Sequence, residues 1–253
     1  MSRKILLSSH QPVYLPWLGF FHKLAASDLF VVLDNVPYTR YLYYNRNTIN
    51  SKTGPVQLTV PVHFTNNEVQ FHNKVRISDN RKWAKKHWNS ISHAYSKSPF
   101  FNNYSEELFE IYHSDWSLLI DLNMRLMKFF MNHLGINTKI IMASDYNFVG
   151  KKSNLILDIA SKLKANAFIF GKLGRDYADI DSFINSKISP IFQDYIHPEY
   201  SQYKSKNFES YLSILDLLFF HGPKSNSILL SGNKTRSEYL EEAELIMKGI
   251  ISP

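Results

Sequence analysis

The segment Ile5-Leu-Leu-Ser-Ser-His10-Gln-Pro-Val-Tyr-Leu-Pro-Trp17-Leu-Gly-Phe-Phe-His-Lys23 decides the fold of this chain. Its first five residues have the composition of a buried strand, and the two prolines that follow exclude regular strand or helix before Trp17. A helix is predicted to start near Trp17, and a second strand follows within 28–34. Strand, polar turn, helix and strand make a β-α-β unit. Such a unit binds ligands beyond the carboxyl ends of its strands. In this chain the two predicted strands end at His10 and Asp34.

A second β-α-β unit is predicted near 138–171, with a strand at 138–142, a helix at 154–163 and a strand at 167–170. It ends in the turn Gly171-Lys172-Leu-Gly174-Arg175-Asp-Tyr177, at the position that His10 has in the first unit. The fold class is therefore α/β, with a parallel-sheet core of the nucleotide-binding type.

The residues between the two units predict further elements. Residues 55–62 and 69–77 alternate with period two, which predicts an antiparallel pair with a turn at Asn66-Asn67. The helical pattern from about 79 to 134 predicts a helical subdomain, whose last helix has Ser114 as its N-cap and Gly135 as its stop. No repeat or long linker interrupts the chain, so 1–253 is interpreted as a single domain.

Composition narrows the functional class. The chain has 253 residues, 44% of them hydrophobic, and contains no Cys, which excludes disulfides, a thiolate nucleophile and a thiolate metal site. A reducing, cytoplasmic location fits this composition, and neither a signal peptide nor a transmembrane span is predicted. The formal net charge of +7 suits an anionic partner. Because the basic residues are scattered, we expect a nucleotide or a phosphorylated sugar rather than nucleic acid. The histidines have no metal-ligand spacing, so no metal site is predicted.

Three residues are candidates for catalysis, each with a structural alternative. His10 has a side chain suited to general base catalysis or to donating to a phosphate, but it would also cap carbonyls in a proline-rich turn. Asp34 would orient His10 or bind a hydroxyl, or simply form a turn at a strand end. Asp216 is surrounded by apolar residues on a predicted helix at 213–219, so it either faces a polar cleft or needs a buried partner.

Two segments are candidates for an anion site. Lys172 and Arg175 belong to a turn with paired glycines, which suits a diphosphate. Asn45 and Arg46 offer a hydrogen bond and a charge, with a structural role in a loop as the alternative.

These stretches together resemble the WbqC-like family of bacterial proteins, over nearly the whole chain. The resemblance is carried by His10-Gln11-Pro12-x-Tyr14-Leu-Pro16-Trp17-x-Gly19-Phe-Phe-x-Lys23, Leu33-Asp34-Asn-Val36-x-Tyr38, Asn45-Arg46-Asn47, Leu58-Thr-Val-Pro61-Val, Trp83, Tyr95, Gly171-x-x-Gly174-x-x-Tyr177, Tyr200-x-Gln202 and Ser213-Ile-Leu-Asp216-Leu-Leu. The chain departs from the family pattern at Thr39-Arg40, where the family often has a polar residue and then Lys.

The resemblance implies an enzyme that modifies an activated sugar in the synthesis of O-antigen, the lipopolysaccharide side chain, or a related surface polysaccharide. The predicted substrate-binding residues are Gln11, Tyr14, Trp17, Lys23, Tyr38, Asn45, Arg46, Gly171, Lys172, Gly174, Arg175, Tyr177, Tyr200 and Gln202. The opening arrangement is also similar, more loosely, to the nucleotide-binding core of pantothenate synthetase and the nucleotidyltransferases.

The leading hypothesis is a transferase that forms an amide on a nucleotide-linked amino sugar. It needs an anion site for the diphosphate, a base for the attacking amine and donors for the oxyanion. No cofactor is certain, and the acyl donor would be an acyl-CoA, an acyl-adenylate made from ATP, or a charged transfer RNA. The alternatives are a glycosyltransferase or nucleotidyltransferase of the same pathway, and a non-catalytic polysaccharide assembly protein.

Overall fold

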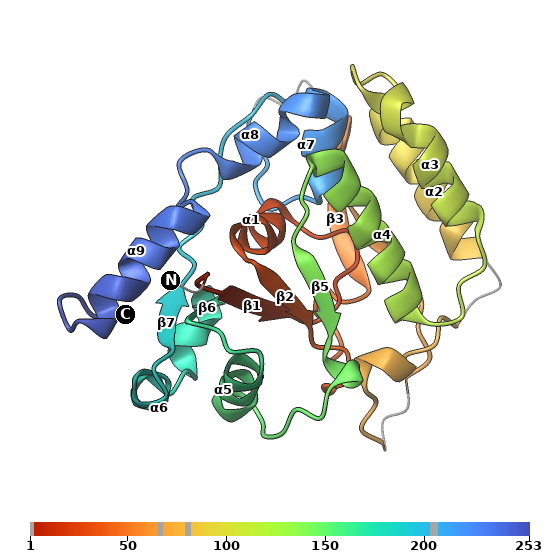
Figure 1. Cartoon of the computed structure of the whole chain (residues 1–253). Helices are drawn as coiled ribbons and strands as arrows, with labels where there is room; N and C mark the ends of the chain where they lie inside the picture. Colours follow the sequence, from red (N-terminus) through yellow and green to blue (C-terminus); the bar gives the residue numbers. More distant parts are fainter. Residues whose placement is uncertain (1–2, 65–67, 79–81, 203–206) are drawn as a thin grey trace.

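The computed structural model describes residues 3–64, 68–78, 82–202 and 207–253, and it has the predicted α/β fold (Figure 1). A five-stranded parallel sheet has the strand order β5-β2-β1-β6-β7, and β3 and β4 form a separate antiparallel pair. The strands are β1 (Leu6–His10), β2 (Leu29–Val32), β3 (Arg46–Ser51), β4 (Gly54–Thr59), β5 (Lys139–Met142), β6 (Ala167–Phe170) and β7 (Ser189–Phe192).

Helices cover both faces of the parallel sheet. The α-helices are α1 (Leu18–Ala26), α2 (Lys82–Tyr95), α3 (Phe101–His113), α4 (Leu119–Leu134), α5 (Ser153–Lys162), α6 (Ile180–Asn185), α7 (Ile214–His221), α8 (Ser225–Leu230) and α9 (Arg236–Met247). Short 3₁₀ turns are η1 (His72–Lys74), η2 (Ala143–Asp145), η3 (Lys172–Asp176) and η4 (Gly222–Lys224). In Figure 1, α5 and α6 lie on one side of the sheet, with α1 and α4 on the other and α9 along β7.

The strand order reverses between β1 and β6. From β1 the chain proceeds through β2 to β5 on one side, and then crosses to β6 and β7 on the other. The register pairs Ser8 with Ile169, so His10 and Gly171, each two residues further along, reach the same edge of the sheet. This is the topological switch point, where open parallel sheets form a ligand crevice.

The turn between β1 and α1 is held by side-chain and backbone contacts. Leu15 has φ 46°, a left-handed conformation that is costly for a residue with a Cβ. The Asn47 Nδ2 donates to the Leu15 carbonyl at 2.5 Å and lies 3.4 Å from the Tyr14 carbonyl, while the Ile214 N–H donates to Pro16. These bonds fix the start of α1, which begins after Trp17 as the sequence predicts.

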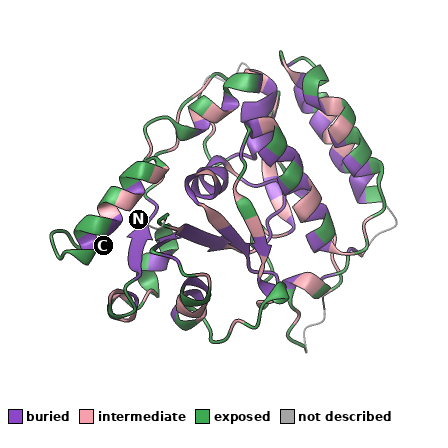
Figure 2. Cartoon of the chain, in the orientation of Figure 1, coloured by how far each residue is buried: buried purple, intermediate pink, exposed green. Residues whose placement is uncertain are grey.

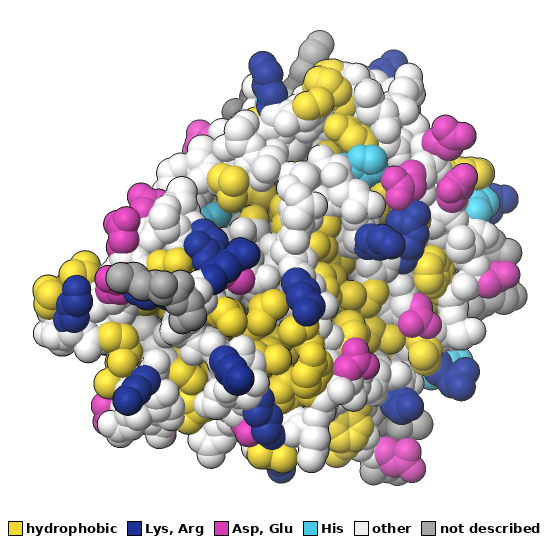
Figure 3. All heavy atoms as spheres, in the orientation of Figure 1, with side chains coloured by type: hydrophobic (Ala, Val, Ile, Leu, Met, Phe, Trp, Pro, Cys, Tyr) yellow, Lys and Arg dark blue, Asp and Glu magenta, His cyan; other side chains and the backbone are white. Residues whose placement is uncertain are grey.

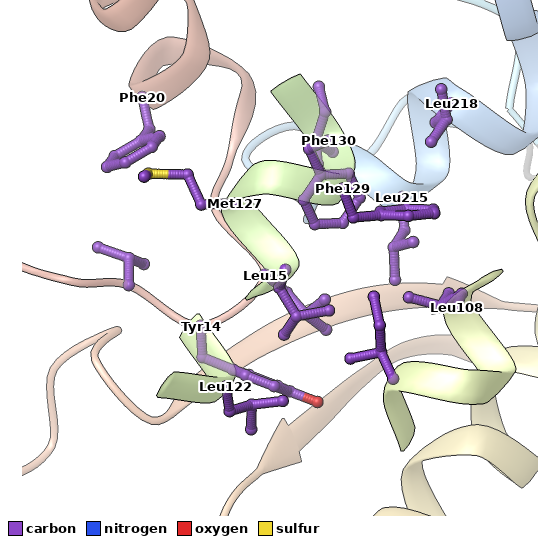
Figure 4. Close-up of a cluster of buried hydrophobic side chains, with 14 of the residues drawn as sticks. Tyr14, Leu15, Phe20, Leu108, Leu122, Met127, Phe129, Phe130, Leu215 and Leu218 are labelled. Carbon is purple, nitrogen blue, oxygen red and sulfur yellow. The ribbon is translucent and has the colours of Figure 1, made fainter. Parts of the chain in front are cut away.

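The interior is built mainly on the α1 face of the sheet. Figure 2 shows buried residues along the strands and on the inward sides of α1, α4 and α7. The close-up in Figure 4 shows the largest cluster, in which Phe20, Phe129, Phe130 and Leu215 come from three different helices. On the opposite face Phe168 and Phe170 pack against Phe183 of α6. The sheet is therefore the middle of three layers.

The antiparallel pair exists, but one of its strands differs from the prediction. Residues 54–59 pair with 46–51 and not with 69–77. Lys52 and Thr53 connect β3 to β4 in a much shorter loop than the predicted one. Gly54, directly after them, has φ 112°. Residues 72–74 form a 3₁₀ turn, and only isolated bridges such as Val62 with Ile77 remain of the expected pairing. The expected turn at Asn66-Asn67 lies outside the described residues.

The start of the last helix predicted within 79–134 is also corrected. The helix begins at Leu119 with Leu118 as its N-cap, whereas Ser114 is the C-cap of α3 and donates its hydroxyl to the Glu110 carbonyl. Ser114 continues the hydrogen bonding of α3, so residues 115–118 separate that helix from α4. The end of α4 is as predicted, since Gly135 has φ 65°.

A pair of glycine substitutions tests the packing at the end of β6. In Gly174→Ala the new Cβ would lie 2.5 Å from the Phe170 Cβ, so we expect a loss of about 1–3 kcal/mol in the free energy of unfolding. In Gly171→Ala the nearest atom lies 3.9 Å away, so the stability should change by less than about 0.5 kcal/mol. Urea denaturation measures both. Equal effects of the two substitutions would contradict this packing.

Candidate functional site

The candidate site lies at the carboxyl ends of β1 and β6, around the side chain of Lys23. This side chain is 4% exposed, and its Nζ donates to the Ser9 carbonyl at 2.9 Å. Among the described residues no carboxylate forms an ion pair with it. Burial lowers the pKa of the Lys23 ammonium from its ordinary 10.5 to about 8. A buried cation without a counter-charge is costly, and it attracts an anionic ligand.

Gly171 lies beside this ammonium. A Cβ added at Gly171 would have the Lys23 Nζ as its only neighbour within 4 Å, at 3.9 Å. The backbone of the second glycine-bearing corner therefore passes alongside the cation with no side chain in between. The two corners predicted from the sequence, at His10 and at Gly171, come together in this way.

His10 presents a neutral imidazole at the same edge. Its Nδ1 lies 2.9 Å from the Gln11 carbonyl, which can only accept, so the proton is on Nδ1 and Nε2 has a free lone pair. Burial, followed by the charge of Lys23, lowers the pKa of His10 to about 3. The rings of Trp17 and Phe20 hold the imidazole edge-on, with centroids 5.7 and 5.3 Å away. The free protein therefore carries a positioned acceptor next to a cation.

A second imidazole near His10 was not predicted from the sequence. His72 is 2% exposed, and its Nε2 has no hydrogen-bond partner among the described residues. Burial lowers its pKa to about 4, opposed by the charge of Asp34. The rings of Tyr44 and Tyr38 flank it at 4.4 and 5.3 Å. The alternating pattern at 69–77 predicted a strand here, so no local pattern indicated that this side chain would lie near His10.

Asp34 links three segments at the end of β2. Its Oδ1 accepts from the Ser144 N–H at 2.9 Å, and its Oδ2 lies 3.5 Å from the Asn73 Nδ2. Its carbonyl also accepts from the Asn73 N–H. None of these described hydrogen bonds reaches His10, so the geometry matches the turn-forming alternative for Asp34 more closely than the orienting one.

The cations of the second corner point elsewhere. The Arg175 guanidinium donates to the Asp194 carboxylate at 2.9 Å and lies over the Phe192 ring at 4.4 Å, at the end of β7. Lys172 and Tyr177 are exposed, and Gly174 is buried against Phe170. The backbone of this turn therefore lies beside Lys23, whereas its Arg175 side chain is bonded to Asp194.

Asp216 belongs to a separate buried polar cluster. It is fully buried, and its Oδ1 accepts from the Tyr95 hydroxyl at 3.0 Å. That hydroxyl also accepts from the Asn50 N–H at 3.0 Å. The Asp216 Oδ2, the Tyr200 hydroxyl and the Asn50 Nδ2 have no partner within hydrogen-bond distance among the described residues. Burial raises the pKa of Asp216 to about 6, opposed chiefly by the hydrogen bond from Tyr95. Tyr200 and Gln202 lie near Asp216, which makes no described contact with His10.

The other predicted substrate-binding residues divide into buried and accessible ones. Tyr14 is fully buried, with its hydroxyl bonded to His87 and Tyr112. The Asn45 amide donates to the Val60 carbonyl within the turn that follows β4. Gln11, Trp17 and Arg46 are only partly buried and lie nearer the surface.

The chain that forms this site is similar to known proteins. The model of the WbqC-like protein family matches residues 11–228, which include the His10–Lys23 turn from its second residue, the Gly171 corner and Asp216. This chain belongs to the WbqC-like protein family. The uncharacterized protein Rv1507c of Mycobacterium tuberculosis is 33% identical over 227 residues, which cover 87% of this chain and 95% of the relative. No solved structure matches.

The surface gives two further facts about this WbqC-like protein. No helix within the described ranges has the length and apolar character needed to cross a bilayer. On the face shown in Figure 3, Lys and Arg side chains lie singly and in small groups around a broad hydrophobic area. That scatter differs from the single basic stripe typical of nucleic-acid binding proteins.

Asp216 generates a testable pH dependence. Its pKa is raised in the folded state, so its contribution to stability is present below about pH 4 and is lost as the pH rises through about 6. Asp216→Asn keeps an acceptor for Tyr95 but never becomes charged. We expect the variant to gain up to about 3 kcal/mol relative to the parent protein between about pH 4 and pH 7. Urea denaturation across this range measures it, and parallel curves for the two proteins would contradict the buried charge.

Proposed function

We propose that this protein is a transferase that binds a nucleotide-linked amino sugar at the carboxyl ends of β1 and β6 and forms an amide on its amino group, in the synthesis of a surface polysaccharide. The observation that carries the proposal is the buried Lys23 ammonium, which has no described carboxylate partner and lies beside the neutral imidazole of His10. The chain belongs to the WbqC-like family, and the pathway in this proposal is the one that the resemblance to this family implies.

The anion site follows from the charge balance at Lys23. Its Nζ has one described acceptor, the Ser9 carbonyl, although an ammonium has three N–H donors. A diphosphate would supply acceptors for the others and the missing negative charge. The open side at Gly171 leaves room for a phosphate oxygen to approach. The ligand would thus be held by its diphosphate at the switch point.

His10 is suited to act as the base once the ligand is bound. In the free protein its pKa of about 3 makes it a poor base, partly because of the neighbouring Lys23 charge. A bound diphosphate offsets that charge, so the pKa of the imidazole should rise toward its ordinary value. Nε2 is the nitrogen with the free lone pair, and it would receive the proton.

The reaction balances without a covalent enzyme intermediate. The sugar amine, after losing its ammonium proton to solvent, attacks the carbonyl carbon of an acyl-CoA or acyl-adenylate. A C–N bond forms, and the nitrogen gives a proton to the His10 Nε2. With acyl-CoA the C–S bond then breaks and the thiolate takes that proton. With an acyl-adenylate the C–O bond breaks, AMP departs as an anion, and the His10 imidazolium releases its proton to solvent. Since the chain has no Cys, a cysteinyl acyl-enzyme is excluded.

The oxyanion of the tetrahedral adduct needs a donor. Gln11 and Asn45 are the two amide side chains considered for this role. Asn45 already donates its Nδ2 to the Val60 carbonyl. Gln11, adjacent to His10, is therefore assigned this role in the proposal.

Lys23→Met tests the anion site. The substitution removes the charge but keeps a long apolar stem, so we expect the affinity for a nucleoside diphosphate to fall by about tenfold to a hundredfold. Lys172→Met is the matched control, because Lys172 is exposed, and it should leave the affinity unchanged. Isothermal titration calorimetry measures both. A Lys23→Met variant that binds as tightly as the parent protein would remove the basis of the proposal.

His10→Gln separates chemistry from binding. We expect turnover to fall by about 10²-fold to 10⁴-fold, the usual contribution of a general base, with the affinity for the nucleotide sugar retained. In the assay, the protein is incubated with amino-sugar nucleotides and acyl-CoA, or with a carboxylic acid and ATP in place of acyl-CoA. The molecular masses of the products are then measured. An intact nucleotide sugar with added acyl mass supports amide formation. Loss of the nucleotide instead would favour the glycosyltransferase or nucleotidyltransferase alternative.

A further inference from the structure

An exposed aromatic surface adjoins the site and is not used by the proposed chemistry. It consists of Trp17, Tyr41 and Tyr43, together with Arg46, and we call it the aromatic loop surface. Tyr41 is 71% exposed and Tyr43 is 52% exposed, although both belong to the segment between β2 and β3, close to the sheet edge. Large aromatic side chains left in solvent next to a candidate site are typical of ligand-binding surfaces.

The aromatic loop surface is continuous with the site. The Trp17 ring lies 5.7 Å from the His10 ring, and the Tyr43 ring lies 5.8 Å from the Trp17 ring. The Tyr14 N–H donates to the Tyr43 carbonyl at 3.2 Å, which ties the loop to the turn that carries His10. These rings therefore lie within reach of a ligand whose diphosphate is held at Lys23.

Arg46 adds a cation to this surface. It is the first residue of β3, paired with Thr59, so its backbone is fixed by the hairpin. Its guanidinium carbon lies 5.5 Å from the centroid of the Tyr41 ring. Its Nε is buried and has no hydrogen-bond partner among the described residues. An unpartnered guanidinium N–H beside an exposed ring suits a ligand that carries both a flat ring and polar oxygens.

We propose that the aromatic loop surface binds the nucleoside end of the nucleotide sugar. The base stacks on Tyr43 or Tyr41, and Arg46 donates to a ribose or phosphate oxygen. This inference rests on the proposed function, because it assumes that the diphosphate lies at Lys23. Every base has a π face, so stacking of this kind supplies affinity without requiring base-specific contacts. The amino sugar is then left on the His10 side of the diphosphate, where the amine has to react.

The test compares two ligands that differ only by the nucleoside. The probes are the common nucleoside diphosphates, of which the tightest is used, and inorganic pyrophosphate. In Tyr43→Ala and Tyr41→Ala we expect at least one variant to bind the nucleoside diphosphate about tenfold more weakly, with the pyrophosphate affinity unchanged. Phe109→Ala, an exposed aromatic on α3, is the matched control and should change neither affinity. Calorimetry gives both affinities, and circular dichroism verifies that each variant is folded.

Two outcomes would overturn this inference alone, and a third would instead show that the proposed function fails. If Lys23→Met weakens both ligands but both tyrosine variants and Arg46→Gln bind the nucleoside diphosphate normally, the anion site stands and this subsite is wrong. If the tyrosine variants instead lose binding to anionic lipid vesicles while nucleotide affinity is kept, the surface is a membrane contact. If the parent protein binds neither pyrophosphate nor any nucleoside diphosphate, the proposed function fails first.

Discussion

The hydrogen bond from the buried Lys23 ammonium to the Ser9 carbonyl is the interaction on which the candidate site depends. It places a cation at the point where the strand order reverses, between β1 and β6, with Gly171 alongside. The same charge helps to lower the pKa of His10, so the imidazole is neutral in the free protein. The site thus combines a buried cation, which has no carboxylate partner among the described residues, with an imidazole that is kept neutral first by its own burial and then by that charge.

A second group of buried polar side chains keeps this arrangement in place. Asn47 supports the strained turn at Leu15, and the Asp216 cluster joins α7 to α2 and β3 through Tyr95. Asp216 is fully buried, and Tyr200, which belongs to another of the quoted family motifs, lies next to it. We therefore interpret the shared Tyr200, Gln202 and Asp216 pattern as packing of the C-terminal segment onto the core, and the His10–Lys23 pattern as the part that meets the ligand.

Much of the fold, but less of the site, could be predicted from the sequence. Apolar strands next to glycine and proline turns identified β1, β6 and the parallel sheet, because local composition decides such elements. The hairpin partner of β4 was missed, since residues 46–51 are polar and their buried Asn47 and Asn50 resemble loop residues. The surroundings of Arg175 and His72 could not be predicted for a different reason. Which way a charged or aromatic side chain turns depends on partners such as Asp194 and Tyr44, which are distant in sequence.

The most direct test of the central claim is the pKa of the Lys23 ammonium, measured by nitrogen-15 NMR of the lysine side chains, with Lys23→Met to assign the signal. The account predicts a pKa near 8 in the free protein, as burial without a counter-charge requires. Addition of pyrophosphate should raise it by about one unit or more, because the bound anion stabilises the charged form. A pKa already near 10.5 in the free protein, unchanged by pyrophosphate, would contradict the account.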